Sequence, residues 1–174
     1  MADEPSDTPV EVAPEPERAY GALVSDSLGQ RVLHPTRDAL VATVEQLRAD
    51  GFDQLIDVTA VDYLSHEGQR ELPDGIDAER YEVVVGLISH AKRDRVRLRV
   101  QVPADDARVA SMFDLYPGSE ALEREVYDMF GIEFENHPDL TRILMPEDWI
   151  GYPLRKDYAI GSIPVQFKDA PSTR

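Results

Sequence analysis

Two glutamates, Glu123 and Glu125, are the first candidates for chemistry, because a pair of carboxylates can act as a general acid and a general base. The residues around them predict a helix over 120–130, with an apolar stripe of Leu122, Val126, Met129 and Phe130. Residues i and i+2 of a helix point about 200° apart, so these two carboxylates do not face each other. We instead expect surface ion pairs at four-residue spacing, formed by Glu120, Arg124 and Asp128.

Metal and nucleotide chemistry find little support in the sequence. There is no cysteine, so neither thiolate catalysis nor cysteine-ligated zinc or iron–sulfur clusters belong to this sequence. The four histidines follow none of the usual ligand spacings, and a structural role is favoured for His34, His66, His90 and His137. Glycine-rich phosphate-binding motifs and the G-x-S-x-G elbow are missing. A Ser-His-Asp triad stays open, since its members need not be close in sequence, but we predict no catalytic, cofactor-binding or metal-binding residue.

A third group of candidates combines charged and aromatic side chains near the C-terminus. Arginine together with tryptophan and tyrosine is typical of the hot spots of protein interfaces. The group comprises Arg142, Trp149, Tyr152, Arg155, Lys156, Asp157 and Tyr158. Five prolines after Gly131 interrupt regular structure here, yet the segment is too apolar for a free disordered chain. We therefore predict an extended arm over 131–174 that docks on a partner protein, with packing on its own sheet as the alternative.

The elements that position these residues follow from periodicity. Gly131 ends the helix that carries the glutamates, because glycine adopts the left-handed cap conformation at low cost. Upstream, the patterns predict a hairpin over 20–33, helices over 37–49 and 105–115, strands over 52–64, 81–88 and 95–102, and a polar loop over 66–80. The last strand alternates strictly, and its arginine row is expected to pair with acidic side chains of neighbouring strands or with solvent. The fold class is α+β, a mostly antiparallel sheet with helices packed on one face.

Composition and charge set the domain organisation. Residues 1–17 contain six acids, four prolines and no lysine or arginine, so they are expected to form a disordered acidic tail. The α+β domain covers 18–130, and the proline-rich arm follows. A formal net charge of −16 argues against nucleic acid and against direct adhesion to anionic lipid. No apolar run approaches about 18 residues, and the N-terminus lacks a basic-then-apolar leader, so we expect no membrane span and a cytoplasmic chain.

Three ordered motifs then point to a known family. They are EREVYDMFGI at 123–132, HPDLTRIL at 137–144 and GYPLRKDY at 151–158. Together they closely resemble the C subunit of the proton-pumping NADH:quinone oxidoreductase, respiratory complex I. Many members of that family carry a basic residue or proline where this chain has Thr141. The HPDLTRI form resembles the actinobacterial type, which implies menaquinone as the quinone.

This resemblance implies a non-catalytic structural and docking subunit of the peripheral arm of the complex, held at the cytoplasmic side of the cell membrane through its partners. Electrons would pass from NADH through FMN and iron–sulfur clusters on other subunits to quinone, coupled to proton translocation. The D subunit would be the main partner, with peripheral-arm subunits such as B and I. The residues expected at the partner interface are Glu123, Arg124, Asp128, His137, Arg142, Trp149, Arg155, Lys156 and Asp157.

Three other functions stay open. Related docking subunits belong to membrane-bound hydrogenases and to dehydrogenases that use other electron donors. A stand-alone hydrolase that uses aspartate, glutamate and histidine is a second possibility, which the helical spacing of the glutamates disfavours. A free adaptor domain that binds a peptide at a sheet edge is the third.

Overall fold

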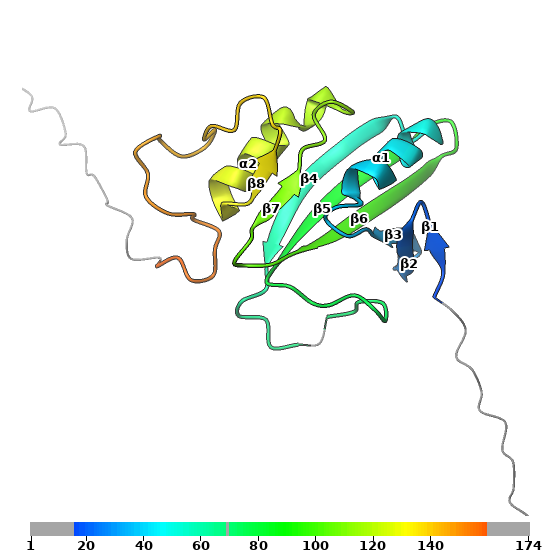
Figure 1. Cartoon of the computed structure of the whole chain (residues 1–174), viewed down its shortest axis with the longest axis horizontal. Coiled ribbons are helices and arrows are strands. Elements are labelled where there is room, and N and C mark those ends of the chain that lie inside the picture. Colours follow the sequence, from blue (N-terminus) through cyan, green and yellow to red (C-terminus); the bar gives the residue numbers. More distant parts are fainter. Residues whose placement is uncertain (1–15, 69, 160–174) are drawn as a thin grey trace, which may run out of the picture.

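A computed structural model describes residues 16–68 and 70–159, so the predicted tail over 1–17 and the end of the arm lie almost entirely outside the described residues. Six strands form one sheet in the order β1-β2-β3-β6-β5-β4. Their bounds are Arg18–Ala19, Ala22–Ser27, Gln30–His34, Gln54–Asp62, Tyr81–Ser89 and Asp94–Val102 for β1 to β6. All neighbouring strands are antiparallel except β3 and β6. Helices α1 (Leu40–Ala49) and α2 (Glu120–Phe130) pack against this sheet (Figure 1). The predicted α+β class with a mostly antiparallel sheet is confirmed.

The core lies between the two helices and one face of the central strands. On β5 and β6 the alternate residues pair across the strands, as Val83 with Val100 and Val85 with Leu98, and all four are fully buried. The stripe of α1 that the sequence predicted, Leu40, Val44 and Leu47, belongs to the same cluster of buried residues. Branched aliphatic side chains suit this pleated, covered surface, and they are the residues whose pattern predicted these strands.

The opposite face of the sheet carries a buried charge cluster. Glu82 of β5 is 1% exposed, and its carboxylate accepts hydrogen bonds from Arg99 of the predicted arginine row at 2.7 and 3.0 Å. Arg70, from the loop between β4 and β5, reaches the same carboxylate at 2.7 Å and lies over the ring of Tyr63. The expected pairing of the arginine row with an acidic neighbour is therefore confirmed for Arg99. The long polar loop is fastened to the sheet through Arg70.

The predicted helix over 105–115 is wrong. This segment instead contains strand β7 (Arg108–Ala110), which pairs in parallel with β8 (Glu133–Glu135) after α2, and it leads into the short 3₁₀ helix η1 (Pro117–Ser119). Arg37 donates to both the carboxylate and the carbonyl of Asp106, which fixes the start of β7. Buried residues at three-residue spacing, Val109 and Met112, fit a helix and a strand-turn equally well. The pairing with β8, more than twenty residues later in the sequence, decides between them.

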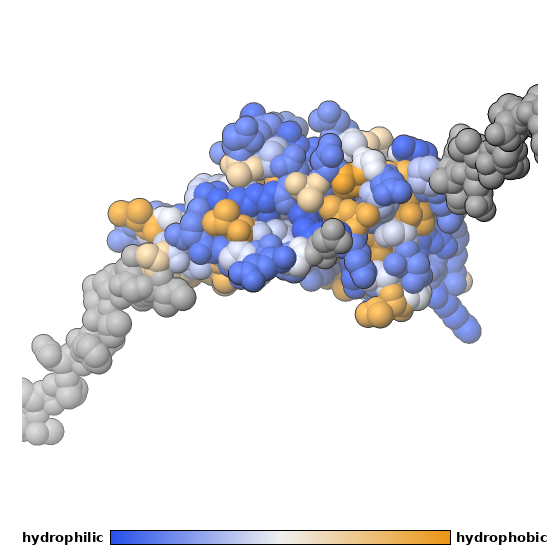
Figure 2. Space-filling model, turned by 90° about the horizontal axis from the view of Figure 1, so that it is seen from below, coloured by the Kyte–Doolittle hydropathy of each residue, from blue (hydrophilic) through white to orange (hydrophobic). Residues whose placement is uncertain are grey.

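The surface of the described chain is mixed. Seen from below, it is mostly hydrophilic, and separate hydrophobic patches interrupt it (Figure 2). Among the described residues, none of the helices has the length and apolar character needed to cross a bilayer.

Candidate docking site on the C-terminal arm

The first contact between α2 and the arm is a buried carboxylate. The side chain of Asp128 is fully buried, and its Oδ2 accepts the backbone N–H groups of Ile143, Leu144 and Met145 at 3.1, 2.7 and 2.8 Å. Its Oδ1 accepts a hydrogen bond from Nη1 of Arg142 at 2.6 Å. Four donors therefore converge on one carboxylate, and together they fix the path of four successive arm residues.

The protonation state of Asp128 follows from these contacts. Burial by itself raises the pKa of this carboxyl, because it removes water from the charged form. The hydrogen bonds from the arm N–H groups and from Arg142 outweigh burial, so the pKa of Asp128 lies below its ordinary value of 3.8. At neutral pH the carboxylate is charged and all of its donors are aligned on it.

The neighbouring arginine has a different role from the one predicted. Arg124 reaches Glu120 at 3.7 Å, but the expected pair with Asp128 is wrong, because Asp128 points to Arg142. The guanidinium of Arg124 donates to the carbonyl and the hydroxyl of Thr141, at 3.0 and 2.9 Å. Thr141 of the second motif therefore supplies two acceptors to Arg124 of α2. The hydroxyl gives this arginine a neutral partner where a basic residue would repel it.

The second contact forms at the C-terminal end of α2. Arg155 donates through Nε to the carbonyl of Phe130 at 2.5 Å, and its guanidinium lies between the rings of Tyr152 and Tyr81, 4.4 and 5.5 Å from their centroids. The N–H of Leu154 binds the carbonyl of Met129 at 3.1 Å. The last carbonyls of a helix have no partner within the helix, and a cation is favourable there. The arm thus caps the helix that precedes it.

The third contact fastens the arm to the sheet. The backbone N–H of Lys156 binds Oδ2 of Asp62, the last residue of β4, at 2.8 Å. Arg80 bridges the two segments, with ion pairs of 2.9 Å to Asp62 and 2.8 Å to Asp157. The side chain of Lys156 itself is exposed. The described part of the arm therefore packs on its own domain, and docking of the arm on a partner stays a prediction.

Gly131 is required where the arm leaves α2. Its φ is +69°, and a β-carbon there would lie 2.5 Å from the Tyr152 ring and 2.6 Å from the Arg155 guanidinium. We expect Gly131→Ala to lower the free energy of unfolding by about 1–2 kcal/mol through backbone strain and by a further ~1–3 kcal/mol through overpacking. Urea unfolding measures the change. Gly118→Ala is the control, because nothing lies within 4 Å of its added carbon, and equal losses for both variants would contradict the prediction.

The two glutamates of the opening hypothesis lie in different environments. Glu123 is fully buried and accepts hydrogen bonds from the N–H of Met112 at 2.8 Å and from the hydroxyl of Ser111 at 2.5 Å, whereas Glu125 is exposed. They do not face each other, as the helical spacing predicted. Glu123 instead anchors the turn after β7. His137 is nearby, with Nε2 3.1 Å from the carbonyl of Glu120, so it joins the arm to the start of α2.

The buried Glu123 makes the stability of the fold depend on pH, in the direction opposite to that of a carboxyl whose pKa is lowered on folding. Burial raises the pKa of its carboxyl above the ordinary 4.5, against the hydrogen bond from Ser111. A group whose pKa is raised on folding stabilises the fold below the unfolded pKa and loses that stabilisation as the pH rises through the folded pKa. Glu123→Gln keeps an acceptor for the N–H of Met112 and carries no charge. We therefore expect its free energy of unfolding, relative to that of wild type, to be highest at neutral pH. The gap in unfolding free energy should close below pH 4.5. A gap that does not change with pH would refute this.

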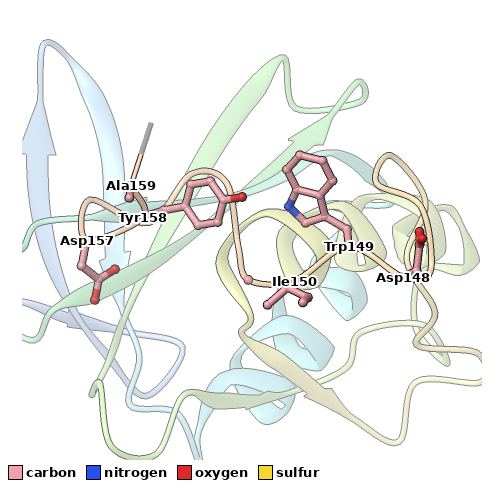
Figure 3. A pocket seen from close by; sticks show the side chains of 7 residues that line it. Asp148, Trp149, Ile150, Asp157, Tyr158 and Ala159 are labelled. Carbon is pink, nitrogen blue, oxygen red and sulfur yellow. The ribbon is translucent and has the colours of Figure 1, made fainter. Parts of the chain in front are cut away.

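An open cavity of about 580 Å³ lies at the end of the described arm. Figure 3 shows the Trp149 and Tyr158 rings on its two sides, with Ile150 between and below them. Asp148, Gly151, Asp157 and Ala159 complete the lining. The indole Nε1 of Trp149 is buried and has no hydrogen-bond acceptor among the described residues.

Comparison with known proteins gives the family. The sequence model of the "Respiratory-chain NADH dehydrogenase, 30 Kd subunit" family matches residues 33–163. The chain belongs to this family. A relative from Salinispora arenicola, named as the C subunit of an NADH-quinone oxidoreductase, is 39% identical over 171 residues, which are 97% of this chain and 65% of that protein. NADH-quinone oxidoreductase subunit 5 of Thermus thermophilus is 39% identical over 161 residues, 89% of this chain and 74% of the relative.

The resemblance to the C subunit, including its actinobacterial type, is thus confirmed for this member of the 30 kDa subunit family. The chain spans about 65% of the length of its Salinispora relative. A solved structure of Nqo5, a trypsin-resistant fragment, superimposes with a TM-score of 0.60 at 36% identity, over 69% of this chain and 90% of that fragment. A chain of the archaeal membrane-bound sulfane sulfur reductase matches with a TM-score of 0.61 at 22% identity, over 88% of this chain and 90% of its own length, which shows the fold alone.

In this family member, the three motifs meet in space. Asp128 of the first contacts Arg142 of the second, and Arg142 in turn donates to the carbonyl of Gly151 in the third at 3.0 Å. Sequence reasoning missed Asp62, Arg80 and Tyr81, since they lie far from the arm in sequence. The one signal in the sequence was the pair of opposite charges at the end of one strand and just before the start of the next, Asp62 and Arg80. Which of the nine predicted interface residues also contact a partner stays a prediction. Within residues 16–68 and 70–159, no three potential metal-ligating side chains gather.

Proposed function

We propose that this chain is a non-catalytic structural and docking subunit in the peripheral arm of a proton-translocating NADH:quinone oxidoreductase. One observation carries the proposal, beyond family membership. Three charged residues of the motifs, Asp128, Arg142 and Arg155, hold the arm against α2 through hydrogen bonds, and none of the three lines the cavity at the end of the arm. Such an arrangement positions a surface and does not build a reaction site.

The redox chemistry is proposed for other subunits. Electrons pass from NADH through FMN and iron–sulfur clusters to quinone, coupled to proton translocation. The sequence holds no cysteine, so its donor set does not fit an iron–sulfur cluster. The likeness to actinobacterial relatives supports menaquinone as the quinone.

The partners follow from the same proposal. The D subunit is the main partner of the arm, and peripheral-arm subunits such as B and I complete the surroundings. The complex holds the chain at the cytoplasmic side of the cell membrane, and the chain has no membrane contact of its own. A net charge of −16 supports indirect attachment, since anionic lipid repels such a chain.

A close alternative keeps the docking role and changes the reaction. The fold also occurs in the archaeal sulfane sulfur reductase complex. An equivalent docking subunit of a membrane-bound hydrogenase or of a dehydrogenase with another electron donor is therefore the second candidate.

The test is an affinity capture of the tagged chain from gently solubilised native membranes, with mass spectrometry of the proteins that co-purify. Flavin and iron–sulfur subunits with NADH:quinone activity are the expected result. Recovery of a nickel–iron hydrogenase would favour the alternative. Recovery of the chain alone, as a stable monomer, would overturn the docking role.

A variant tests the arm within the same assay. We expect Arg155→Ala to reduce co-purification by about tenfold. Without the contact between Arg155 and the end of α2, the arm is less ordered before it binds, and ordering it on binding lowers the affinity for the partner. The sheet should stay folded by circular dichroism. Arg95→Ala is the matched control, since this arginine lies exposed on β6. Equal recovery of both variants would count against a docking role for the arm.

A further inference from the structure

The exposed apolar side chains of the chain are concentrated on the arm. Seven large apolar residues are exposed among those that the structure describes, and four lie within the twelve residues 143–154. They are Ile143, Leu144, Ile150 and Leu154, with exposed fractions of 41, 60, 89 and 50%. Isolated apolar residues are normal on a surface, but a concentration of them marks an interaction site. In Figure 1 the arm runs along α2 at the end of the molecule away from β1–β3.

The backbone beneath these side chains is already fixed. The N–H groups of Ile143 and Leu144 bind Asp128, the N–H of Leu154 binds the carbonyl of Met129, and the carbonyl of Gly151, next to Ile150, accepts from Arg142. A surface that is ordered before it binds loses less conformational entropy on association. An apolar segment held out in this way is suited to rigid docking, and a flexible linker would need no such anchors.

The charges of this stretch identify the kind of partner. Glu147 and Asp148 are its only charged residues, both are exposed, and neither forms an ion pair among the described residues. The two arginines that flank the stretch are engaged elsewhere, Arg142 with Asp128 and Arg155 with the end of α2, and the exposed Lys156 lies beyond them. The arm therefore combines an apolar ridge with an acidic rim.

We propose that residues 143–154 form an apolar ridge that docks on a protein partner whose contact surface has an apolar centre and a basic rim. This inference rests on the proposed docking function and states its chemistry. A second copy of the chain fits poorly, because a two-fold contact between ridges would bring Glu147 and Asp148 against the same acids in a chain of net charge −16.

The cavity beside the ridge gives the docking site a specific element. It lies between Trp149 and Tyr158, with Ile150 also in its lining, and has a volume of about 580 Å³. Figure 3 shows the Trp149 nitrogen on the side of the ring that faces Ile150 and Tyr158. A partner side chain of apolar or aromatic type fits this volume.

The experiment compares matched variants of the full chain. The chain is co-expressed with the D subunit of its own complex and captured through a tag, and the recovered D subunit is quantified. Leu144→Ser with Ile150→Ser is expected to lower recovery at least about tenfold, which corresponds to ~1.4 kcal/mol. Leu28→Ser with Ile56→Ser is the control, because these residues are exposed to 105 and 44% outside the arm, and it should bind as wild type. Glu147→Lys with Asp148→Lys should weaken recovery and reverse its salt dependence.

The recovery of the D subunit by wild type and by the ridge variant separates the two proposals. If wild type recovers the D subunit and the ridge variant recovers as much, the inference is overturned and the docking function stands. If wild type recovers none, the proposed function fails. A chain that ends at Ala159 separates one further case. The ridge substitutions are made in this truncated chain as well. If they no longer lower the recovery of the D subunit there, residues 160–174 of the same chain occupy the ridge, and the inference is again overturned.

Discussion

Asp128→Ala is expected to lower the free energy of unfolding by about 3–5 kcal/mol, the typical effect of removing one partner of a buried ion pair. The substitution leaves the Arg142 guanidinium, 15% exposed, without its carboxylate, and it leaves three arm N–H groups without an acceptor. Urea unfolding followed by circular dichroism measures the global effect. Hydrogen exchange at Ile143, Leu144 and Met145 measures the local one, and we expect these three amides to lose most of their protection.

Asp148→Ala is the control for this prediction. It removes an exposed aspartate of the same arm that forms no ion pair among the described residues, so stability and exchange should match wild type within about 0.5 kcal/mol. Unchanged protection in Asp128→Ala would show that other contacts hold the arm. A global loss without faster local exchange would show that α2, rather than the arm, depends on the carboxylate.

Glu82→Ala is expected to cost a similar ~3–5 kcal/mol, at the other face of the sheet. Its removal leaves two guanidinium groups, Arg70 and Arg99, beside an empty space, with side chains only 9 and 17% exposed. Burial raises the pKa of Glu82, but the hydrogen bonds of Arg99 and Gln101 outweigh burial and lower it overall, so the charged form is the one that stabilises the fold.

Chemical denaturation at two pH values tests this charge. A carboxyl whose pKa is lowered on folding stabilises the fold above the unfolded pKa, and the contribution disappears as the pH falls through the folded pKa. The difference between wild type and Glu82→Ala should therefore be large at pH 7 and shrink in strong acid. Glu45→Ala, at an exposed position of α1, should change stability little at either pH. A difference for Glu82→Ala that persists in acid would assign the loss to packing.

The helix that carries the first motif was predictable, because every signal for it is local. The apolar stripe and the glycine at its end both lie within residues 120–131, and the structure has α2 over the predicted range. The strand at Arg108–Ala110 was not predictable in the same way. Its hydrogen bonds come from β8, and the local pattern of buried residues matched a helix as well.

The partners of the charged residues were harder to predict than the elements. Arg124 stands four residues before Asp128, so helical spacing favoured that pair, yet Arg142 and three N–H groups from 143–145 took the carboxylate. Backbone donors carry no sequence signature, so a carboxylate that binds them cannot be distinguished from an exposed one. The contact between Lys156 and Asp62 spans 94 residues and depends on where β4 ends, which only the folded sheet defines.

The mode of binding at Asp128 bears on how this surface can change over evolutionary time. The carboxylate holds main-chain N–H groups, which every amino acid except proline provides. Side chains at 143 and 144 can therefore be exchanged without loosening the anchor beneath them. The exposed side chains of the arm can thus change one substitution at a time as the sequence of a partner changes, while the backbone path of the arm is kept.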